Sequence, residues 1–551
     1  MSARLNINLS VGGALALKDW KFLLLLAMAV IGTSAAVKAD DAVVPEYQSA
    51  NDWYRDAQLQ MAKKPDFGAK LKAKNIILFI GDGMGVSTIT AARILDGQNK
   101  GLSGEENSLS FESFPFTGLS KTYNVDAQTP DSAGTMTAIV TGVKTDAGII
   151  GIDETVERGV CGSGKPLVSA LELAEIAGKA TGFVTTTRVT HATPAATYAK
   201  SPERNWEDIS DMPGVAIEAG CKDIASQLIS FESNLKKRFP KVQTIDGIEV
   251  VMGGGRRHFL PNDSSFNSTD AVSETEGDRN DGRNLIQEWQ DIYPNGDYIF
   301  DKAGFEALKA GETQQLLALF NESHMHYEAD RHNDKAGEPS LPQMTAKAID
   351  ILNKNENGFF LLVEAGRIDH AHHAGNAFNA LTDTIELSKA VSTALAKTNQ
   401  DETLIIVTAD HSHVFTMAGY PKRGNPILGK VVNVGNSGAA KAADGKPYTT
   451  LGYANGLGYR DLGTESDADA SYITAPRAGR HDLTEVDTTK PGYHQEALVP
   501  LEAETHGGED VAIYATGPGA ETVIGVNEQN LIFHIMNQAA DLATNKAAKS
   551  H

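Results

Sequence analysis

The 551-residue chain is poor in cysteine and carries fewer basic than acidic side chains. Its two cysteines, Cys161 and Cys221, stand in no Cys-x-x-Cys motif, which argues against a zinc site built of paired thiolates. Lys and Arg number 49 against 71 Asp and Glu, a formal charge of −22, which argues against nucleic acid or an anionic membrane surface as a partner. If the ligand is itself an anion, bound cations must reverse the local field.

Long hydrophobic runs are also missing after the N-terminus. Three basic residues precede the apolar run Phe22–Ile31, and Val37 and Ala39 place small residues at a cleavage site. This run is too short for a bilayer, so residues 1–39 are expected to be a signal peptide, not a retained membrane anchor. We therefore expect an exported protein, periplasmic or secreted, with no membrane span after cleavage. Its two cysteines then either pair in a disulfide or remain separate buried thiols.

Five short runs of Ile, Val, Leu and Phe have the composition of fully buried strands. Apolar residues recur at helical spacing between them, in Pro166–Ala180 and again from Phe378 to Ile385. Alternating strands and helices predict an α/β fold with a large, mostly parallel central sheet and helices on both faces. The runs are Ile76–Ile80, Phe183–Thr187, Phe359–Val363, Leu404–Thr408 and Val511–Ala515.

We expect residues 40–551 to form a single domain with two insert-like surface segments. Residues 262–282 are polar and predict an exposed loop. Residues 420–500 carry many Gly, Lys, Asp and Pro and show no metal-ligand pattern. Both segments are interpreted as surface elaborations.

Potential metal ligands follow four of the five predicted strands. Because ligands bind at the carboxyl ends of strands in open α/β sheets, these side chains should meet in one crevice. Several unpaired carboxylates there would repel one another or protonate unless cations hold them. For any one acidic residue alone, capping of the next helix is the alternative. The side chains are Asp82, His191, Thr193, Glu364, Asp410 and His411.

The segment that follows Glu364 strengthens the metal hypothesis. Asp369 and His373 are four residues apart, so on a helix they share one face and can chelate one ion. His372 is three residues from Asp369 and is the rival ligand by spacing alone. His506 precedes the last predicted strand and could supply a further nitrogen.

Ser132 is the candidate nucleophile. The helix-compatible stretch Ala133–Val140 follows it, which would place Ser132 at a helix N-terminus that favours an anion. On this stretch alone, an ordinary N-cap serine is the simpler interpretation. No G-x-S-x-G elbow surrounds Ser132, which disfavours a Ser-His-Asp hydrolase. The turn Gly81–Gly85 fits a dinucleotide fingerprint poorly, since its third glycine comes one position early and Asp82 would face the pyrophosphate.

Four motifs, taken in order, resemble those of the alkaline phosphatase family. The resemblance extends from about residue 52 to about residue 539, interrupted by the two insert-like segments. Any one motif is moderately specific, and the ordered set is very specific. The motifs are IGDGMGVS from Ile80, TPDSAGT from Thr129, TADHSH from Thr408 and THGGED from Thr505.

The resemblance implies two zinc ions and one magnesium ion. The first zinc matches Asp369, His373 and His506, which selects His373 over His372. The second zinc matches Asp82, Asp410 and His411, with Ser132 as the reacting group. The magnesium ion matches Asp82, Thr193 and Glu364.

Further roles are implied by the resemblance alone. Arg204 matches the phosphate-binding arginine and Asp131 the residue that orients it, while His413 would support the ligands. His191 and His370 stand where some members have Asp and Lys, which affects the third metal. Asn321 stands where one branch has a carboxylate for calcium. A Cys161–Cys221 disulfide and a homodimer are also implied.

The implied reaction hydrolyses a phosphomonoester to an alcohol and inorganic phosphate through a phosphoserine on Ser132. Divalent ions would hold the attacking and leaving oxygens, and Arg204 would grip two non-bridging oxygens. Little in this set contacts the alcohol, so we expect a broad range of small phosphomonoester substrates. The alternatives are a two-metal phosphodiesterase or sulfatase with a similar core, and an inactive exported protein that binds metal or phosphate. No C/S-x-P-x-R motif surrounds Ser132, which disfavours the sulfatase.

Overall fold

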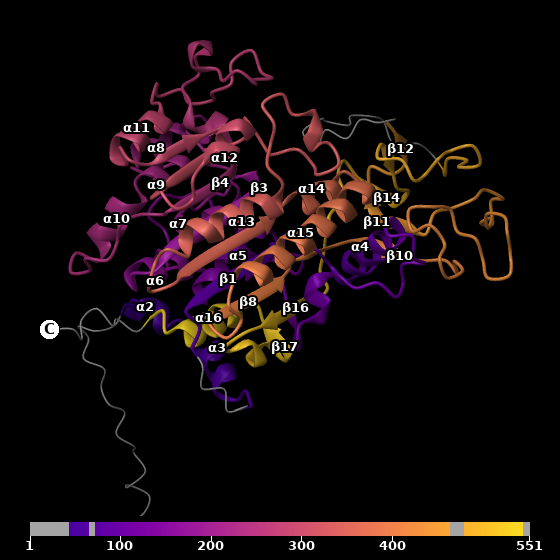
Figure 1. Ribbon diagram of the computed structural model, residues 1–551, viewed down its shortest axis with the longest axis horizontal. Helices are drawn as coiled ribbons and strands as arrows, with labels where there is room; N and C mark the ends of the chain where they lie inside the picture. The colour runs from indigo at the N-terminus through magenta and orange to yellow at the C-terminus, as the bar shows by residue number, and fades with distance from the viewer. Residues whose placement is uncertain (1–42, 66–71, 463–478, 544–551) are drawn as a thin grey trace, which may run out of the picture. The chain divides into compact units, whose positions relative to one another are not determined.

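A ten-stranded sheet forms the centre of the computed structural model, which describes residues 43–65, 72–462 and 479–543 (Figure 1). Neighbouring strands are parallel except β16, which runs antiparallel to both β2 and β8. The strand order is β17 (Gly525–Glu528), β2 (Phe116–Lys121), β16 (Val511–Thr516), β8 (Thr403–Thr408), β1 (Asn75–Gly81), β7 (Phe359–Ala365), β3 (Ala180–Arg188), β4 (Val250–Gly254), β6 (Leu316–Leu319) and β5 (Asp297–Ile299).

Two apolar cores cover the two faces of this sheet. Alternate residues of β1 enter different cores, Ile76 and Leu78 the first, Ile77 and Phe79 the second. The first core contains Val43 and Val44, which precede α2 (Glu46–Ser49). It also contains residues of α3 (Asp52–Ala62), α5 (Ser132–Thr141), α6 (Ala170–Ile176), α7 (Ala192–Tyr198), α9 (Ile224–Ile229), α10 (Phe231–Arg238), α11 (Leu285–Ile292) and α16 (Leu531–Ala540). The second contains residues of α4 (Val86–Asn99), α12 (Lys302–Ala307), α13 (Leu341–Leu352), α14 (Arg367–His373) and α15 (Ala377–Lys397).

The predicted fold class is confirmed, and each of the five predicted runs is a strand of this sheet. The predicted helix over Pro166–Ala180 is too long at both ends. The helix α6 begins only after Ser169, whose hydroxyl accepts from the Glu172 N–H while the Glu172 carboxylate accepts from the Ser169 N–H. It ends before Gly178, whose φ of 73° breaks the helix.

The remaining elements are short. One small sheet orders as β10 (Phe415–Met417), β11 (Leu451–Gly456) and β14 (Ala497–Pro500); two strand pairs are β12 (Arg460–Asp461) with β13 (Tyr493–His494) and β9 (Ser412–His413) with β15 (His506–Gly507). The short helices are α8 (Gly214–Glu218), η1 (Ser110–Ser113), η2 (Ile209–Asp211), η3 (Arg256–Phe259), η4 (Ser264–Phe266), η5 (Arg331–Asn333) and η6 (Ala520–Val523).

The segment 262–282 is not simply an exposed loop. Asp270, Glu276 and Arg279 are buried, and the first two pair with the buried Arg256. Buried charges are stable only when paired and hydrogen-bonded, so these contacts fix the loop to the body of the chain. The segment 420–500 contributes β11 and β14 to the small sheet that they form with β10, and Tyr453 of β11 contacts His372.

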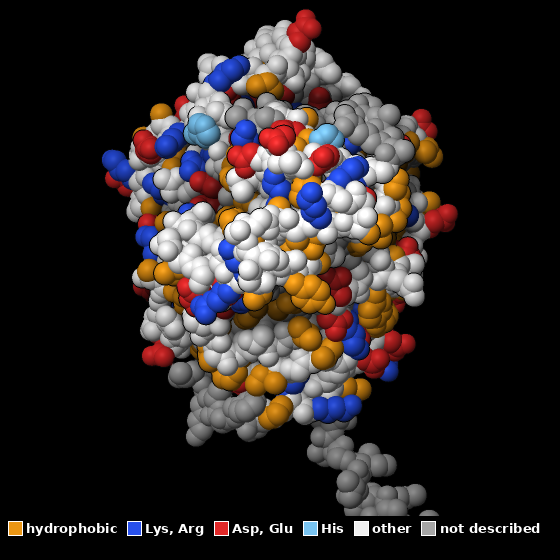
Figure 2. All heavy atoms as spheres, turned by 90° about the vertical axis from the view of Figure 1, so that its right-hand side faces the viewer, with side chains coloured by type: hydrophobic (Ala, Val, Ile, Leu, Met, Phe, Trp, Pro, Cys, Tyr) orange, Lys and Arg blue, Asp and Glu red, His pale blue; other side chains and the backbone are white. Residues whose placement is uncertain are grey.

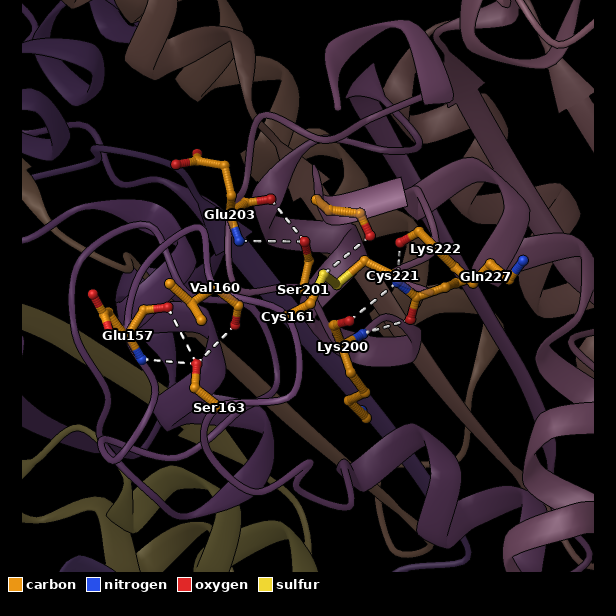
Figure 3. The surroundings of a disulfide bond; sticks show 11 residues. Glu157, Val160, Cys161, Ser163, Lys200, Ser201, Glu203, Cys221, Lys222 and Gln227 are labelled. Carbon is orange, nitrogen blue, oxygen red and sulfur yellow. Dashed lines mark hydrogen bonds between the residues drawn. A yellow bond between two sulfur atoms is a disulfide. The ribbon is translucent and has the colours of Figure 1, made fainter. Parts of the chain in front are cut away.

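Cys161 and Cys221 form the expected disulfide, which closes a loop of 60 residues (Figure 3). The two cysteines pack against a small apolar cluster of Trp206, Met212 and Ala216. No helix among the described residues is long and apolar enough to cross a membrane. The predicted signal peptide, residues 1–39, lies outside the described residues and stays a prediction.

Candidate active site

The four central parallel strands carry the predicted ligands to one edge of the sheet. Strands β8, β1, β7 and β3 are consecutive neighbours, and Ile80 of β1 pairs with Glu364 of β7. Asp82 and Asp410 follow β1 and β8 directly, and Thr193 lies in the first turn of α7 after β3. Parallel register therefore brings together side chains that are hundreds of residues apart in the sequence.

Asp369, His373 and His506 present three ligand atoms to one point. His506 Nε2 lies 3.1 Å from His373 Nε2, and both nitrogens lie 3.3 Å from Asp369 Oδ1. Ligands about 2.0 Å from a tetrahedral ion are separated by about 3.3 Å, so this triangle has the size of one zinc coordination face.

The protonation of the two histidines follows from their other nitrogens. His373 Nδ1 lies 2.6 Å from the Glu504 carbonyl, and His506 Nδ1 lies 2.7 Å from the Pro130 carbonyl, so each Nδ1 must donate. Burial lowers the pKa of His373 to about 4, which keeps its ring neutral. The Nε2 atoms of the two rings then face each other 3.1 Å apart, an arrangement that a cation bound between them would satisfy.

His413 belongs to the same group of possible ligands, and Glu504 contacts it. His413 Nε2 lies 2.7 Å from Asp369 Oδ1, and its Nδ1 lies 2.6 Å from Glu504 Oε2. Burial would raise the pKa of Asp369, but His373, His413 and His506 hold it well below its usual range. Glu504 was not singled out from the sequence, although it stands two residues before His506.

The rival ligand His372 faces elsewhere. Its Nε2 lies 2.9 Å from Thr88 Oγ1 and its Nδ1 lies 2.8 Å from the Tyr453 hydroxyl. Both ring nitrogens are therefore satisfied by neighbouring hydroxyls, and the side chain is fully buried. Tyr453, in the segment 420–500, is a second residue that the sequence pattern did not reveal.

A second group surrounds Ser132. His411 Nε2 lies 3.3 Å from Asp82 Oδ1, 3.4 Å from Asp410 Oδ2 and 3.1 Å from Ser132 Oγ. The Ser132 hydroxyl also lies 3.4 Å from Asp82 Oδ1. Two carboxylates, an imidazole nitrogen and a hydroxyl oxygen thus converge, as donors to one divalent ion would.

Ser132 is the first residue of α5 rather than its N-cap. Asp131 is the cap, and its Oδ1 accepts from the Gly134 N–H at 3.1 Å. The alternative in which Ser132 serves only as a cap is therefore wrong, because another side chain performs that role. The Ser132 hydroxyl is free to face the ligand group at the positive end of the helix.

A third group is formed by Asp82, Glu364 and His191, with Thr193 beside it. Asp82 Oδ2, Glu364 Oε1, Thr193 Oγ1 and His191 Nδ1 are buried atoms that have no hydrogen-bond partner among the described residues. Orphaned buried oxygens are rare in folded proteins and indicate an ion or water. The oxygen-rich donor set fits a hard cation such as magnesium.

The carboxylates of these groups repel one another. Burial raises the pKa of Asp82 well above its usual value, and Asp410, Asp369 and Glu364 raise it further. Burial likewise raises the pKa of Asp410, and it raises that of Glu364 to about 7. Divalent cations would reverse these shifts and keep the carboxylates ionised.

Arg204 projects toward the same region. Its Nη1 donates to Asp131 Oδ2 at 3.0 Å, and its Nη2 donates to His191 Nε2 at 3.1 Å. Asp131 is itself fixed by the Asn124 amide, which donates to Oδ1 at 3.0 Å. The guanidinium is therefore held in one orientation.

His370 lies outside the three ligand groups. Its ring centroid is 4.2 Å from that of His324 and 5.5 Å from that of His191, and Arg367 Nη1 donates to its Nδ1. Asn321, two residues after β6, donates to Glu338 at 2.9 Å. His326, Asp334 and Glu338 form a further group of possible ligands there.

Comparison with known proteins shows the family to which this site belongs. A family model described as alkaline phosphatase matches residues 73–542. The tissue-nonspecific alkaline phosphatase of Gallus gallus is 45% identical over 511 residues, covering 91% of each chain. That of Homo sapiens is 42% identical over 513 residues, covering 92% of this chain and 91% of its own. The alkaline phosphatase of Thermus thermophilus has the same fold, with a TM-score of 0.60 at 23% identity over 91% of this chain and 96% of its own. The chain belongs to the alkaline phosphatase family.

Proposed function

We propose that this enzyme hydrolyses phosphomonoesters to an alcohol and inorganic phosphate through a phosphoserine on Ser132. The observation that carries the proposal is the place of Ser132 Oγ, 3.1 Å from His411 Nε2 and 3.4 Å from Asp82 Oδ1 at the start of α5. A serine whose neighbouring imidazole and carboxylate are themselves potential metal ligands suits attack on phosphorus assisted by cations.

Metal dependence follows from the family, and the donor sets support a choice of ions. We assign zinc to Asp369, His373 and His506, a second zinc to Asp82, Asp410 and His411, and magnesium to Asp82, Thr193 and Glu364. The nitrogen-containing sets suit zinc, while the all-oxygen set suits magnesium. When bound, such ions offset the charge of the dianionic ester and lower the pKa of bound hydroxyl groups and water.

The side chains of the chain then have distinct tasks. Ser132 Oγ forms the bond to phosphorus as the ester oxygen leaves, and the alcohol takes up a proton. Arg204 binds two non-bridging oxygens bidentately, with Asp131 keeping the guanidinium plane fixed. Water then attacks the phosphoserine, which frees inorganic phosphate and returns a proton to Ser132.

Replacement of Ser132 by alanine tests the proposal. We expect Ser132→Ala to lose at least about 10³-fold in phosphate release, because the covalent route is closed. Rapid quenching with a labelled substrate should trap phosphoenzyme in the unaltered protein and none in Ser132→Ala. The matched control is Ser113→Ala, an exposed serine at the end of η1.

A labelled covalent intermediate that persists in Ser132→Ala would assign the nucleophile to another residue. The rates on an aryl phosphate monoester and its diester separate this function from a two-metal phosphodiesterase. Comparable rates across several unrelated monoesters are expected, since every role assigned above concerns the phosphoryl group or the metal ions and none concerns the alcohol. Strong discrimination among simple monoesters would contradict that breadth.

We also propose that the enzyme is an exported homodimer. The edge strand β14 exposes Leu498 and Val499, which are 83% and 50% accessible, and Tyr420 and Val434 are 86% and 78% accessible. Figure 2 shows hydrophobic side chains on the face that includes this part of the chain, and uncovered apolar edges favour association. Light scattering on the purified protein should give twice the chain mass. N-terminal sequencing of the exported protein should begin after Ala39.

A further inference from the structure

A surface cleft of about 440 Å³ lies among α6, α9, α10 and the residues that follow α7. None of its lining residues belongs to the three ligand groups of the candidate active site. The volume is within the range of sites that hold small ligands. The residues that carry the argument are Glu172, Tyr198, Lys200, Phe231, Leu235 and Arg238.

The floor of the cleft is apolar and rigid. Tyr198 and Phe231 are each 4% accessible, and Leu235 is 1% accessible. The Tyr198 ring stacks on Phe183 with centroids 5.6 Å apart, and its hydroxyl donates to the Val189 carbonyl at 2.9 Å. A fixed aromatic wall of this kind suits a flat apolar group.

The walls carry an excess of positive charge. Glu172 is the only acidic side chain lining the described cleft, and both of its oxygens are already engaged. Oε1 accepts from Arg238 Nη1 at 2.7 Å, while Oε2 accepts from the Ser169 N–H at 2.8 Å and lies 3.1 Å from Lys200 Nζ. The Glu172 carboxylate therefore contacts both Arg238 and Lys200 as well as capping α6, so it does not neutralise the two cations fully. Lys237 adds a third, exposed cation.

Lys200 is the central cation of the cleft. Its backbone is fixed by Gln227, whose Oε1 accepts from the Lys200 N–H at 2.8 Å, and its side chain extends away from the disulfide (Figure 3). Among the described residues, its ammonium contacts only the Glu172 carboxylate at 3.1 Å. Burial lowers the pKa of Lys200, with Arg238 acting in the same direction and Glu172 against it. The ammonium is buried and contacts one anion, so its unused donors would be satisfied by a second anion that enters the cleft.

The neighbouring Tyr47 does not neutralise this charge. Its hydroxyl donates to the Pro166 carbonyl at 2.6 Å at the rim of the cleft. Burial raises the pKa of Tyr47 above its ordinary value, so the phenol stays uncharged near neutral pH. The cleft is therefore a local cationic site on a molecule whose formal charge is −22.

We propose that this cleft is a second ligand site that binds a small organic anion, with a carboxylate, sulfonate or phosphate head on an aromatic or compact apolar body. The head contacts Lys200 and Arg238, and the body lies on Tyr198, Phe231 and Leu235. A cation of the same shape is excluded by charge, and a bare oxyanion leaves the apolar floor uncovered. The site stands apart from the phosphatase reaction and does not depend on Ser132.

Calorimetric titration with benzenesulfonate tests the proposal, because this probe is permanently anionic and carries no phosphoryl group. One probe should bind per chain. Lys200→Met and Arg238→Gln should each weaken binding by about tenfold, the value of a lost charged hydrogen bond. Lys236→Met is the matched control. Lys236 lies on α10 like Arg238, but it pairs with Glu232 and does not line the cleft. Thermal melting of each variant checks that it is folded.

If Lys200→Met fails to fold, Arg238→Gln still tests the proposal, because the Arg238 side chain is partly exposed. Benzylammonium, with the opposite charge on a similar ring, should not bind, and inorganic sulfate should bind more weakly than benzenesulfonate. The proposal is overturned if benzenesulfonate does not bind, or if both cleft variants bind it as the unaltered protein does. Equal binding of sulfate would overturn the role given to the apolar floor.

Discussion

Arg204 has both terminal nitrogens fixed before any substrate arrives, by Asp131 at 3.0 Å and by His191 at 3.1 Å. A lysine at this position keeps the charge but has neither the planar fork nor the two parallel donors. We expect Arg204→Lys to lower kcat/KM about 10- to 100-fold. Steady-state kinetics with an aryl phosphate measure this loss.

Arg158→Lys is the control for that experiment, since Arg158 forms a similar pair with Glu203 and has a side chain that is 47% accessible. It should leave kcat/KM unchanged. If Arg204→Lys retains full kcat/KM, phosphate is held by point charge alone and the bidentate role of Arg204 is wrong.

A pair of carboxyl groups far from the catalytic centre links stability to pH. Glu175 Oε1 lies 2.5 Å from Thr181 Oγ1, and Glu249 Oε2 accepts from the Thr181 N–H at 2.7 Å. Burial raises the pKa of Glu249 from its ordinary 4.5 to about 8, and burial and Glu249 raise that of Glu175. Between about pH 4.5 and pH 8, the folded state therefore keeps a proton on Glu249 that the unfolded chain has released. Stability from this pair is complete below about pH 4.5 and is lost as the pH rises through about 8.

Glu249→Gln should therefore stabilise the protein at alkaline pH, by about 1–3 kcal/mol near pH 9, and have little effect near pH 4.5. The neutral amide keeps an acceptor for the Thr181 N–H and carries no charge to repel Glu175. Thermal melting across this pH range measures the difference. The control is Glu312→Gln, whose side chain is 75% accessible and should show no pH-dependent gain. A gain of equal size at both pH values would contradict the linkage.

At the scale of elements, the buried Arg256 is one of the residues that anchor the segment 262–282. Arg256 pairs with Asp270 at 2.9 Å and with Glu276, and its Nη1 donates to the Leu319 carbonyl at 2.8 Å. Arg256→Met leaves the buried Asp270 and Glu276 carboxylates without their cationic partner, so we expect a loss of about 3–5 kcal/mol in the free energy of unfolding. Denaturant unfolding measures this loss, and limited proteolysis should cut first within 262–282.

The matched control for this change is Lys309→Met, which removes a solvent-exposed ion pair with Glu312. Exposed pairs contribute at most about 1 kcal/mol, so its stability should be nearly unchanged. Equal stability losses in Arg256→Met and Lys309→Met would show that the buried ion pairs do not anchor the loop.

At the scale of the whole molecule, an acidic protein must attract a dianion. The formal charge of −22 opposes phosphate binding, and the clustered carboxylates Asp82, Asp369 and Asp410 add to that field locally. Only cations at this edge of the sheet can reverse its sign. Strong chelation should therefore reduce activity at least about 100-fold and also lower Tm, because facing lone pairs and carboxylates lose their partner ions.

Phosphate release and thermal melting after chelation, with metal analysis of the same sample, measure this effect. Zinc together with magnesium should restore both activity and Tm, whereas magnesium alone should not. Full activity in protein shown to be free of metal would contradict the assignment of all three ligand groups.

The strands, and the gathering of the candidate ligands at one edge of the sheet, could be inferred from the sequence for a simple reason. A buried parallel strand such as β7 needs an unbroken apolar run, and a polar residue at its end, here Glu364, has only the sheet edge to occupy. The bounds of α6 could not be inferred, because apolar spacing continues through Pro166–Ala180 and only the Ser169–Glu172 capping contacts decide where the helix begins. The buried ion pairs of Asp270 and Glu276 with Arg256 could not be inferred either, because the polar composition of 262–282 is also that of an exposed loop.

The sequence by itself determined the fold class and which residue types follow each strand, since both depend on local composition and order. Tertiary structure alone decided which atoms meet. His372 and His373 lie three and four residues after Asp369, so helical spacing allows either to share a metal ion with it. In the structure, however, both ring nitrogens of His372 contact Thr88 and Tyr453, whereas His373 faces His506. The contact of Glu504 with His413 joins residues 91 positions apart, and the cleft around Lys200 combines side chains of several helices. Such sites exist only once packing brings their charges together.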